Sequence, residues 1–432
     1  MMDGILALSL LFTTASQLRL AALPVGPGEL GLVAWIACTA YKTLVSGAPY
    51  RAPTGSALLG FWAAFALALS LGVIVAMFTG ERFEPALMLH DVVAYTLIAI
   101  VSCSLCTTDP ARMRRICWIL VACGALSLSL QFANGIGLLQ IPGIDPWFWE
   151  RLRGWSSNPN QLAIVCLVVA LLAWHLADTA ASSGSRLLAL LLLIPPIVVG
   201  RMSKSDTFTL ALVASLPIWM AAKLIIWTRN DPVEASLRGS IARLSLVALP
   251  VLLLCFTPLV VSRAEAVRGL VLGLAKNAGA EAAGEANLRM TLWHEAMQRG
   301  IGSGMLGLGP GPHLQIPASI VAGRVNAGIR VENLEHPDQN GTANYEAHNT
   351  LLDVFTQGGL LAVASVLWLL WRAIKCVYRA RSAGLVSLFA GVTIFMMTGN
   401  IVRQPIFWFA LMLCLTAPVA RLESRRPTQP AW

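Results

Sequence analysis

Apolar runs about the length of a membrane-spanning helix recur along most of this chain, and they constrain the fold more than any other feature. Only 12% of the residues are charged and the mean hydropathy is +0.69, whereas soluble domains carry roughly a quarter charged residues. The runs are continuous rather than alternating, which favours helices over a barrel of strands. The sequence therefore predicts an all-α polytopic membrane protein.

We predict about twelve transmembrane helices. Their expected ranges are 5–21, 28–46, 57–79, 86–106, 116–135, 161–177, 186–200, 206–227, 242–261, 350–371, 384–401 and 404–420. The first run lacks a preceding basic segment and a clear cleavage site, so we interpret it as a retained helix. The chain then divides into residues 1–261 with nine helices, a large polar loop at 262–348 containing short helices, and residues 349–432 with three helices.

The distribution of basic residues predicts the orientation. With the N-terminus on the inside, 17 of the 31 basic residues fall on inner connections and seven on short outer ones. The large loop holds seven basic residues against eight acidic ones. Because basic residues accumulate on the cytoplasmic side, we expect both termini in the cytoplasm and the large loop in the periplasm or outside the cell. Basic residues beside the membrane explain the net charge of +9, because they lie next to lipid headgroups. We therefore predict no nucleic-acid partner.

The motifs of several common activities are missing from the sequence. The nine cysteines lie in or beside apolar runs and outside the large loop, so we predict no disulfide there. Cys103 and Cys106 have C-x-x-C spacing but follow an apolar helix. The four loop histidines lack ligand-like spacing, so we predict neither a metal nor a cofactor. No G-x-x-x-x-G-K-[ST] segment is present, which argues against ATP-driven transport by this chain alone.

Basic residues predicted on the outer side run against the usual orientation of positive charge. Five of them are candidates for a common site: Arg151, Arg153, Arg201 and Lys204 at helix ends, and Arg289 in the large loop. Each alone fits a lipid headgroup contact or an ion pair with an acid such as Glu150 or Asp206. Together they suit a polyanion, and phosphate is the natural ligand. Arg403 is a further outer cation.

Two segments beside these cations have a predicted local structure. In Asn158-Pro159-Asn160 we expect a turn in which Asn160 caps the sixth helix. In the large loop we expect a helix over Asn287–Arg299 that Gly300 ends. Arg289, Trp293 and Met297 share one face of it, which favours an amphipathic helix on the membrane from which Arg289 can still reach a lipid phosphate.

His348 is the candidate catalytic residue. It stands directly before Asn349, which we predict to cap the tenth helix. The positive end of a helix disfavours an imidazolium ion, so a histidine there stays neutral at pH 7 and can accept a proton as a general base. A structural role is the alternative. The histidines at 90, 175, 294, 313 and 336 lack this setting.

Four segments resemble the bacterial O-antigen ligase and O-antigen polymerase family, in the expected order and topology. They are Arg153-Gly154 with Asn158-Pro159-Asn160-Gln161-Leu162-Ala163; Gly200 to Ser205; Arg289-x-x-x-Trp293 with Leu306-Gly307-Leu308-Gly309-Pro310-Gly311; and His348-Asn349-x-x-Leu352 leading to Gly358-Gly359-Leu360. The resemblance covers roughly residues 120–370.

The resemblance implies an inner-membrane glycosyltransferase that works on the periplasmic face without metal or nucleotide. The donor would be a glycan on undecaprenyl diphosphate. The acceptor would be lipid A-core for a ligase or another lipid-linked glycan for a polymerase, as in exopolysaccharide synthesis. The family often shows Ser-Arg-Gly after the seventh helix, where this chain has Arg201-Met202-Ser203-Lys204-Ser205, so either Arg201 or Lys204 could contact phosphate.

The residues leave two alternatives open. The first is within the family, because the sequence does not distinguish a ligase from a polymerase. A transporter or flippase for an anionic lipid-linked or small anionic substrate is the second alternative, and it should have ionisable groups or broken helices near mid-bilayer. The gathering of basic residues at outer helix ends favours the enzyme.

Overall fold

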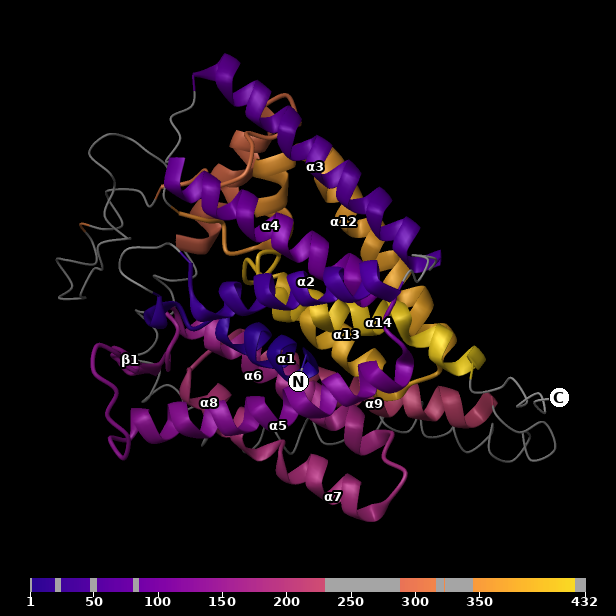
Figure 1. Ribbon diagram of the computed structural model, residues 1–432. Helices are drawn as coiled ribbons and strands as arrows, with labels where there is room; N and C mark the ends of the chain where they lie inside the picture. Colours follow the sequence, from indigo (N-terminus) through magenta and orange to yellow (C-terminus); the bar gives the residue numbers. More distant parts are fainter. Residues whose placement is uncertain are drawn as a thin grey trace, which may run out of the picture.

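The computed structural model describes residues 2–19, 25–46, 53–80, 85–229, 288–315, 322 and 345–423, and these fold almost entirely into helices (Figure 1). The helices are α1 (Met2–Phe12), α2 (Pro27–Ser46), α3 (Pro53–Thr79), α4 (Pro85–Leu105), α5 (Pro110–Gly135), α6 (Pro159–Asp178), α7 (Ser183–Leu191), α8 (Ile194–Met202), α9 (Asp206–Arg229), α12 (Thr350–Ala380), α13 (Ala383–Met396) and α14 (Pro405–Glu423). Residues 288–302 are also helical. A hairpin joins β1 (Trp147–Phe148) to β2 (Arg151–Leu152), and η1 (Ser16–Leu18) is a short 3-10 turn.

The protein is a multi-pass membrane protein, but the expected count of about twelve spans is wrong. Within the described residues, seven helices are long and apolar enough to cross a bilayer, namely α3, α4, α5, α6, the α7–α8 pair, α9 and α12. The expected helix at 242–261 lies outside the described residues.

Four expected spans are too short or not apolar enough to cross a bilayer. The run at 5–21 forms a helix only over Met2–Phe12, about 16 Å long, before the chain turns into η1. The apolar parts of α13 and α14 are similarly short, and α2 carries Glu29 and Lys42. Hydropathy detects apolar residues but not where the chain turns, so it predicts full spans for these runs.

Proline divides the span formed by α7 and α8. Pro195 and Pro196 have no backbone N–H, so the carbonyls four residues earlier lose their helical partners. The helix accordingly stops at Leu191 and restarts at Ile194.

α6 lies at the centre of the bundle (Figure 1), and 78% of its most apolar 18-residue segment is buried.

Polar contacts at the helix ends separate into two sets. Each contact joins ends that the charge distribution predicts on the same side of the membrane. The inner set contains Arg112–Asp3 at 2.7 Å, Arg114–Thr179 at 3.1 Å and Lys223–Asp178 at 2.5 Å; the outer set contains Gln17–Ser156 at 2.7 Å, Lys204–Glu150 at 2.6 Å and Thr207–Thr398 at 2.6 Å.

α12 is a broken helix. Gly358 and Gly359 leave helical geometry, with a φ of 61° at Gly359. Residues 305–309 fill the break: the N–H groups of Leu308 and Gly309 donate to the carbonyls of Thr356 and Gln357, both at 2.8 Å. The Leu360 N–H donates to the Met305 carbonyl at 2.9 Å. The loop thereby satisfies backbone groups that a break inside an apolar region would otherwise leave unpaired. α3 runs beside α12 at this level (Figure 1).

Candidate functional site

His348 lies in a left-handed turn at the start of α12, with a φ of 53°. The next residue, Asn349, accepts hydrogen bonds from the N–H groups of Leu351 and Leu352 at 3.1 and 3.3 Å, so the predicted cap is confirmed. The Tyr345 ring contacts the imidazole edge-on, with centroids 5.1 Å apart. The histidine therefore sits at the positive end of α12, as expected from the sequence.

The helix at 288–302 packs directly on this turn. Its apolar residues form a small cluster with the turn: Leu288, Leu292, Ala296, Leu314 and Ala347 are all buried. The Trp293 indole N–H donates to the Ala347 carbonyl at 2.9 Å. Arg289 precedes Trp293 by one turn on the same face. The structure thus brings the helix that carries Arg289 against the residue before His348.

Gly300 does not end that helix, as the sequence suggested, because the helix continues to residue 302. A Cβ at Gly300 would lie 2.2 Å from the Phe355 ring. The glycine instead permits close packing of the helix on α12.

Further contacts fix the backbone around His348. The Asp353 carboxylate is buried and accepts the Ala347 N–H at 2.7 Å. Asn349 donates to the Met397 carbonyl at 2.9 Å, and Thr350 donates to the Gly399 carbonyl at 2.6 Å. These bonds tie the turn to its own helix and to the end of α13.

A buried charge cluster lies on the other side of the turn. Arg403 pairs with both Asp91 of α4 and Glu346, which is two residues before His348. The Asp91 side chain is fully buried, and the side chains of Arg403 and Glu346 are 20% and 19% exposed. His90 lies 3.4 Å from Asp91. The sequence predicts Arg403 only as an outer cation, and Asp91 and Glu346 are not among the predicted site residues. A carboxylate within an apolar span was the signal that could have found Asp91.

The four cations at the helix ends gather around the β1–β2 hairpin. Arg151 donates to the Ser203 carbonyl and to the Asn160 side chain, each at 3.1 Å. Arg153 pairs with Asp145 at 3.0 Å and lies over the Phe148 ring. Arg151 therefore links the hairpin to the bundle, whereas the contacts of Arg153 stabilise the hairpin itself.

Arg201 and Lys204 differ in their partners. Lys204, in a left-handed turn with a φ of 47°, pairs with Glu150 at 2.6 Å, one of the ion pairs considered from the sequence. This hydrogen bond and the attraction between the two charges lower the pKa of the exposed Glu150 carboxyl. Arg201 donates to the Thr209 hydroxyl at 2.5 Å and has no carboxylate partner among the described residues. Both cations are exposed, but Arg201 is the one that no described carboxylate neutralises.

The cap of α6 is Asn158 and not Asn160, as the sequence suggested. The Asn158 side chain accepts the Asn160 N–H at 2.8 Å, because Pro159 occupies the first helical position and has no N–H. The Asn160 side chain is then free to accept from Arg151.

Two contacts connect the cation cluster to the histidine turn. Thr207, just after Lys204, hydrogen bonds to Thr398, and Asn349 donates to Met397. The 397–399 segment thus touches the start of α9 on one side and the start of α12 on the other. All six predicted site residues lie at the same end of the bundle, in two neighbouring groups.

Two other loop histidines contact residues outside the two groups of site residues. His313 lies 2.7 Å from the Gly309 carbonyl, and His294 lies 2.9 Å from Gln298. Most of the loop, including His336, lies outside the described residues. In the part of the chain that the structure describes, no group of three His, Cys, Asp or Glu side chains could hold a metal ion.

No family model matches this chain, and no curated protein matches it significantly. The resemblance to the O-antigen ligase and polymerase family stays a prediction from its motifs.

Proposed function

We propose that this protein is a bacterial inner-membrane glycosyltransferase whose donor is a glycan on undecaprenyl diphosphate. Its large loop and outer helix ends face the periplasm, and both termini face the cytoplasm. The acceptor is lipid A-core or a second lipid-linked glycan. The reaction uses the protein's own side chains, without metal or nucleotide.

The observation that carries the proposal is the contact between Trp293 and Ala347. It joins a helix bearing Arg289 to a turn bearing His348, although these residues are far apart in sequence. A cation and a histidine at one outer helix mouth suit transfer from a glycosyl diphosphate. The diphosphate is a good leaving group that needs charge stabilisation more than a general acid.

In the proposed reaction, the acceptor hydroxyl gives its proton to the His348 imidazole and its oxygen attacks C1 of the donor sugar. The bond between C1 and the diphosphate oxygen breaks, and the electron pair leaves with undecaprenyl diphosphate. Attack opposite the leaving group inverts the configuration at C1. Arg289 and Arg201 stabilise the charge that grows on the diphosphate, with Lys204 beside them.

The remaining residues position these groups. Arg151 holds the hairpin next to Arg201 through its bond to Ser203, and Arg153 stabilises the hairpin through its pair with Asp145. Arg403 is committed to Asp91 and Glu346, so we assign it to the support of the histidine turn rather than to phosphate.

The test uses purified protein with undecaprenyl-diphosphate glycan, with and without lipid A-core, followed by gel electrophoresis. A ladder without lipid A-core identifies a polymerase, and one-step transfer to the core identifies a ligase. Absence of both products with active donor contradicts the proposal.

The broken helix α12 favours a second candidate, a transporter or flippase for an anionic lipid-linked substrate. The break is filled by residues 305–309, which makes it an anchor for the loop and weakens this alternative. Translocation of a labelled lipid-linked glycan in proteoliposomes, without glycan transfer, would support it.

A further inference from the structure

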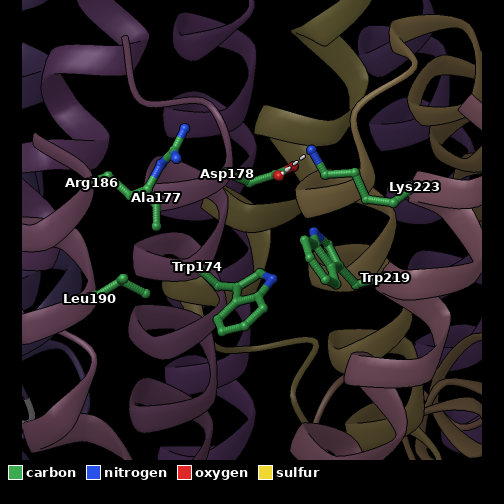
Figure 2. A pocket seen from close by; sticks show the side chains of 7 residues that line it. All are labelled: Trp174, Ala177, Asp178, Arg186, Leu190, Trp219 and Lys223. Carbon is green, nitrogen blue, oxygen red and sulfur yellow. Dashed lines mark ion pairs between the residues drawn. The ribbon is translucent and has the colours of Figure 1, made fainter. Parts of the chain in front are cut away.

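A pocket at the inner end of the bundle has no part in the proposed reaction. It has a volume of about 340 Å³ and lies between α6, α7 and α9 (Figure 2). This volume falls within the roughly 300–1,000 Å³ of small-molecule sites. The residues that line it are Trp174, Ala177, Asp178, Arg186, Leu190, Trp219 and Lys223.

The pocket has two layers, and each helix contributes to both. One turn of helix separates an apolar residue from a charged one on α6 (Trp174 and Asp178), on α7 (Leu190 and Arg186) and on α9 (Trp219 and Lys223). In every case the charged residue is nearer the end of the bundle. Figure 2 shows the charged groups together on one side and the two indoles together on the other.

The apolar layer is built around two tryptophan side chains in contact. The Trp174 and Trp219 rings meet edge to face with centroids 5.2 Å apart, and Leu190 lies across from them. Tryptophan prefers the level of a bilayer where headgroups meet acyl chains. This layer suits the glycerol and first methylenes of a lipid.

The charged layer carries a net positive charge. Lys223 pairs with Asp178 at 2.5 Å, and the exposed Arg186 has no carboxylate partner among the described residues, so it carries the excess charge. A carboxylate beside two cations offers an anion one uncompensated positive charge. A headgroup with a net charge of −1 matches it, whereas a zwitterionic headgroup brings its own cation.

We propose that this pocket binds one anionic phospholipid. The phosphodiester lies against Arg186 and the Lys223 ammonium, and the glycerol lies against the two indoles. The layered arrangement favours binding of an amphiphile over a free phosphate, because half of the lining is apolar. This proposal is independent of the proposed glycosyltransferase activity.

The test measures lipid retention by native mass spectrometry of the full-length protein, purified with equal amounts of dioleoyl phosphatidylglycerol and dioleoyl phosphatidylethanolamine. We expect preferential retention of phosphatidylglycerol. Arg186→Gln should reduce it about fivefold and Arg186→Gln/Lys223→Gln on the order of 25-fold, since each cation near a membrane surface contributes a similar factor. The single variant keeps the Lys223–Asp178 pair, so it reports binding even if the double variant folds poorly.

The matched control is Arg372→Gln/Lys375→Gln on α12. Each of these cations also lies over a tryptophan one turn earlier, at 5.2 and 4.6 Å, but neither lines this pocket. The control should retain phosphatidylglycerol as the wild type does, and millimolar glycerol phosphate should not displace it. Equal loss in both double variants, equal retention of the two lipids, or displacement by glycerol phosphate would overturn the proposal.

Discussion

At the scale of single residues, the turn from Glu346 to Asn349 is determined by its neighbours. Ala347 is held from both sides, by Trp293 at its carbonyl and by Asp353 at its N–H. Glu346 is paired with Arg403, and Asn349 caps α12. His348, the remaining residue of this turn, contacts the Tyr345 ring and is the side chain that we propose for chemistry at the helix mouth.

Replacement of His348 by alanine should lower kcat for glycan transfer by about 10²–10⁴-fold, the usual contribution of a general base. Expression, membrane insertion and thermal stability should stay near wild type. His294→Ala is the matched control. That histidine lies on the loop helix, and its side chain lies within hydrogen-bond distance of Gln298 on the same helix. Transfer at the wild-type rate in His348→Ala would disprove the general-base role.

The partners of Arg201 and Lys204 predict unequal roles. Arg201→Gln should raise the apparent KM for lipid donor by roughly 10-fold or more, the value of one charge-assisted hydrogen bond. Lys204→Gln should have a smaller effect because Glu150 already neutralises the ammonium. Initial rates over a range of donor concentrations give both values. The opposite order would assign the phosphate to Lys204.

At the scale of elements, a break inside a span becomes an attachment point. In α12, Gly359 adopts a φ of 61°, and a Cβ there would lie 2.0 Å from the Met305 carbonyl oxygen. A Cβ at Gly307 would similarly lie 2.5 Å from the Gln357 carbonyl oxygen. Neither residue can gain a side chain without moving the loop that follows the helix at 288–302.

Gly359→Ala should therefore reduce the free energy of unfolding by at least the 1–3 kcal/mol that an unfavourable backbone geometry costs. Gly60→Ala in α3 is the control, because a Cβ there meets nothing within 4 Å and alanine favours helix by roughly 1 kcal/mol. Thermal unfolding in one detergent compares the two. Equal stability would mean that residues 305–309 do not depend on the break.

The contact between α4 and the turn before α14 depends on a buried ion pair. Arg403→Gln leaves Asp91 as a buried carboxylate without its cation, which should destabilise the protein by about 3–5 kcal/mol. Asp91→Asn/Arg403→Gln should recover most of that loss, because the fully buried charge is removed and only the partly exposed Glu346 loses its cation. A double variant as unstable as the single one would show that the pair itself, rather than charge burial, stabilises the contact.

At the scale of the whole molecule, polar contacts separate the two ends of the bundle. Asp3, Thr179 and Asp178 belong to one end, and Glu150, Thr398 and Glu346 belong to the other. The proposed catalytic site and the proposed lipid pocket lie at opposite ends. Their functions can therefore be tested separately.

Reporter fusions test the orientation of the ends. Alkaline phosphatase fused after Leu138, between α5 and α6, should be active, and a fusion after Ala181, between α6 and α7, should be inactive. Green fluorescent protein at the same positions should give the reverse pattern. Active phosphatase only after Ala181 would place the histidine turn in the cytoplasm and contradict periplasmic transfer.

Local and compositional signals in the sequence determined the membrane class, the grouping of helix ends by side and the Asn349 cap. Each depends on neighbouring residues or on the count of charges, which a sequence displays directly. The number of spans was overestimated because α1 and α13 are apolar but short.

Only the tertiary structure decided how the distant parts meet. The sequence predicts a continuous span through Gly358 and Gly359. In the structure the helix breaks there, and residues 305–309 pair with the broken backbone. Asp91 and Arg403 are far apart in sequence, and Gly300 reads as a helix end until the Phe355 ring packs on it. Such pairings depend on which surfaces meet after the helices assemble, and residue spacing along one chain does not contain that information.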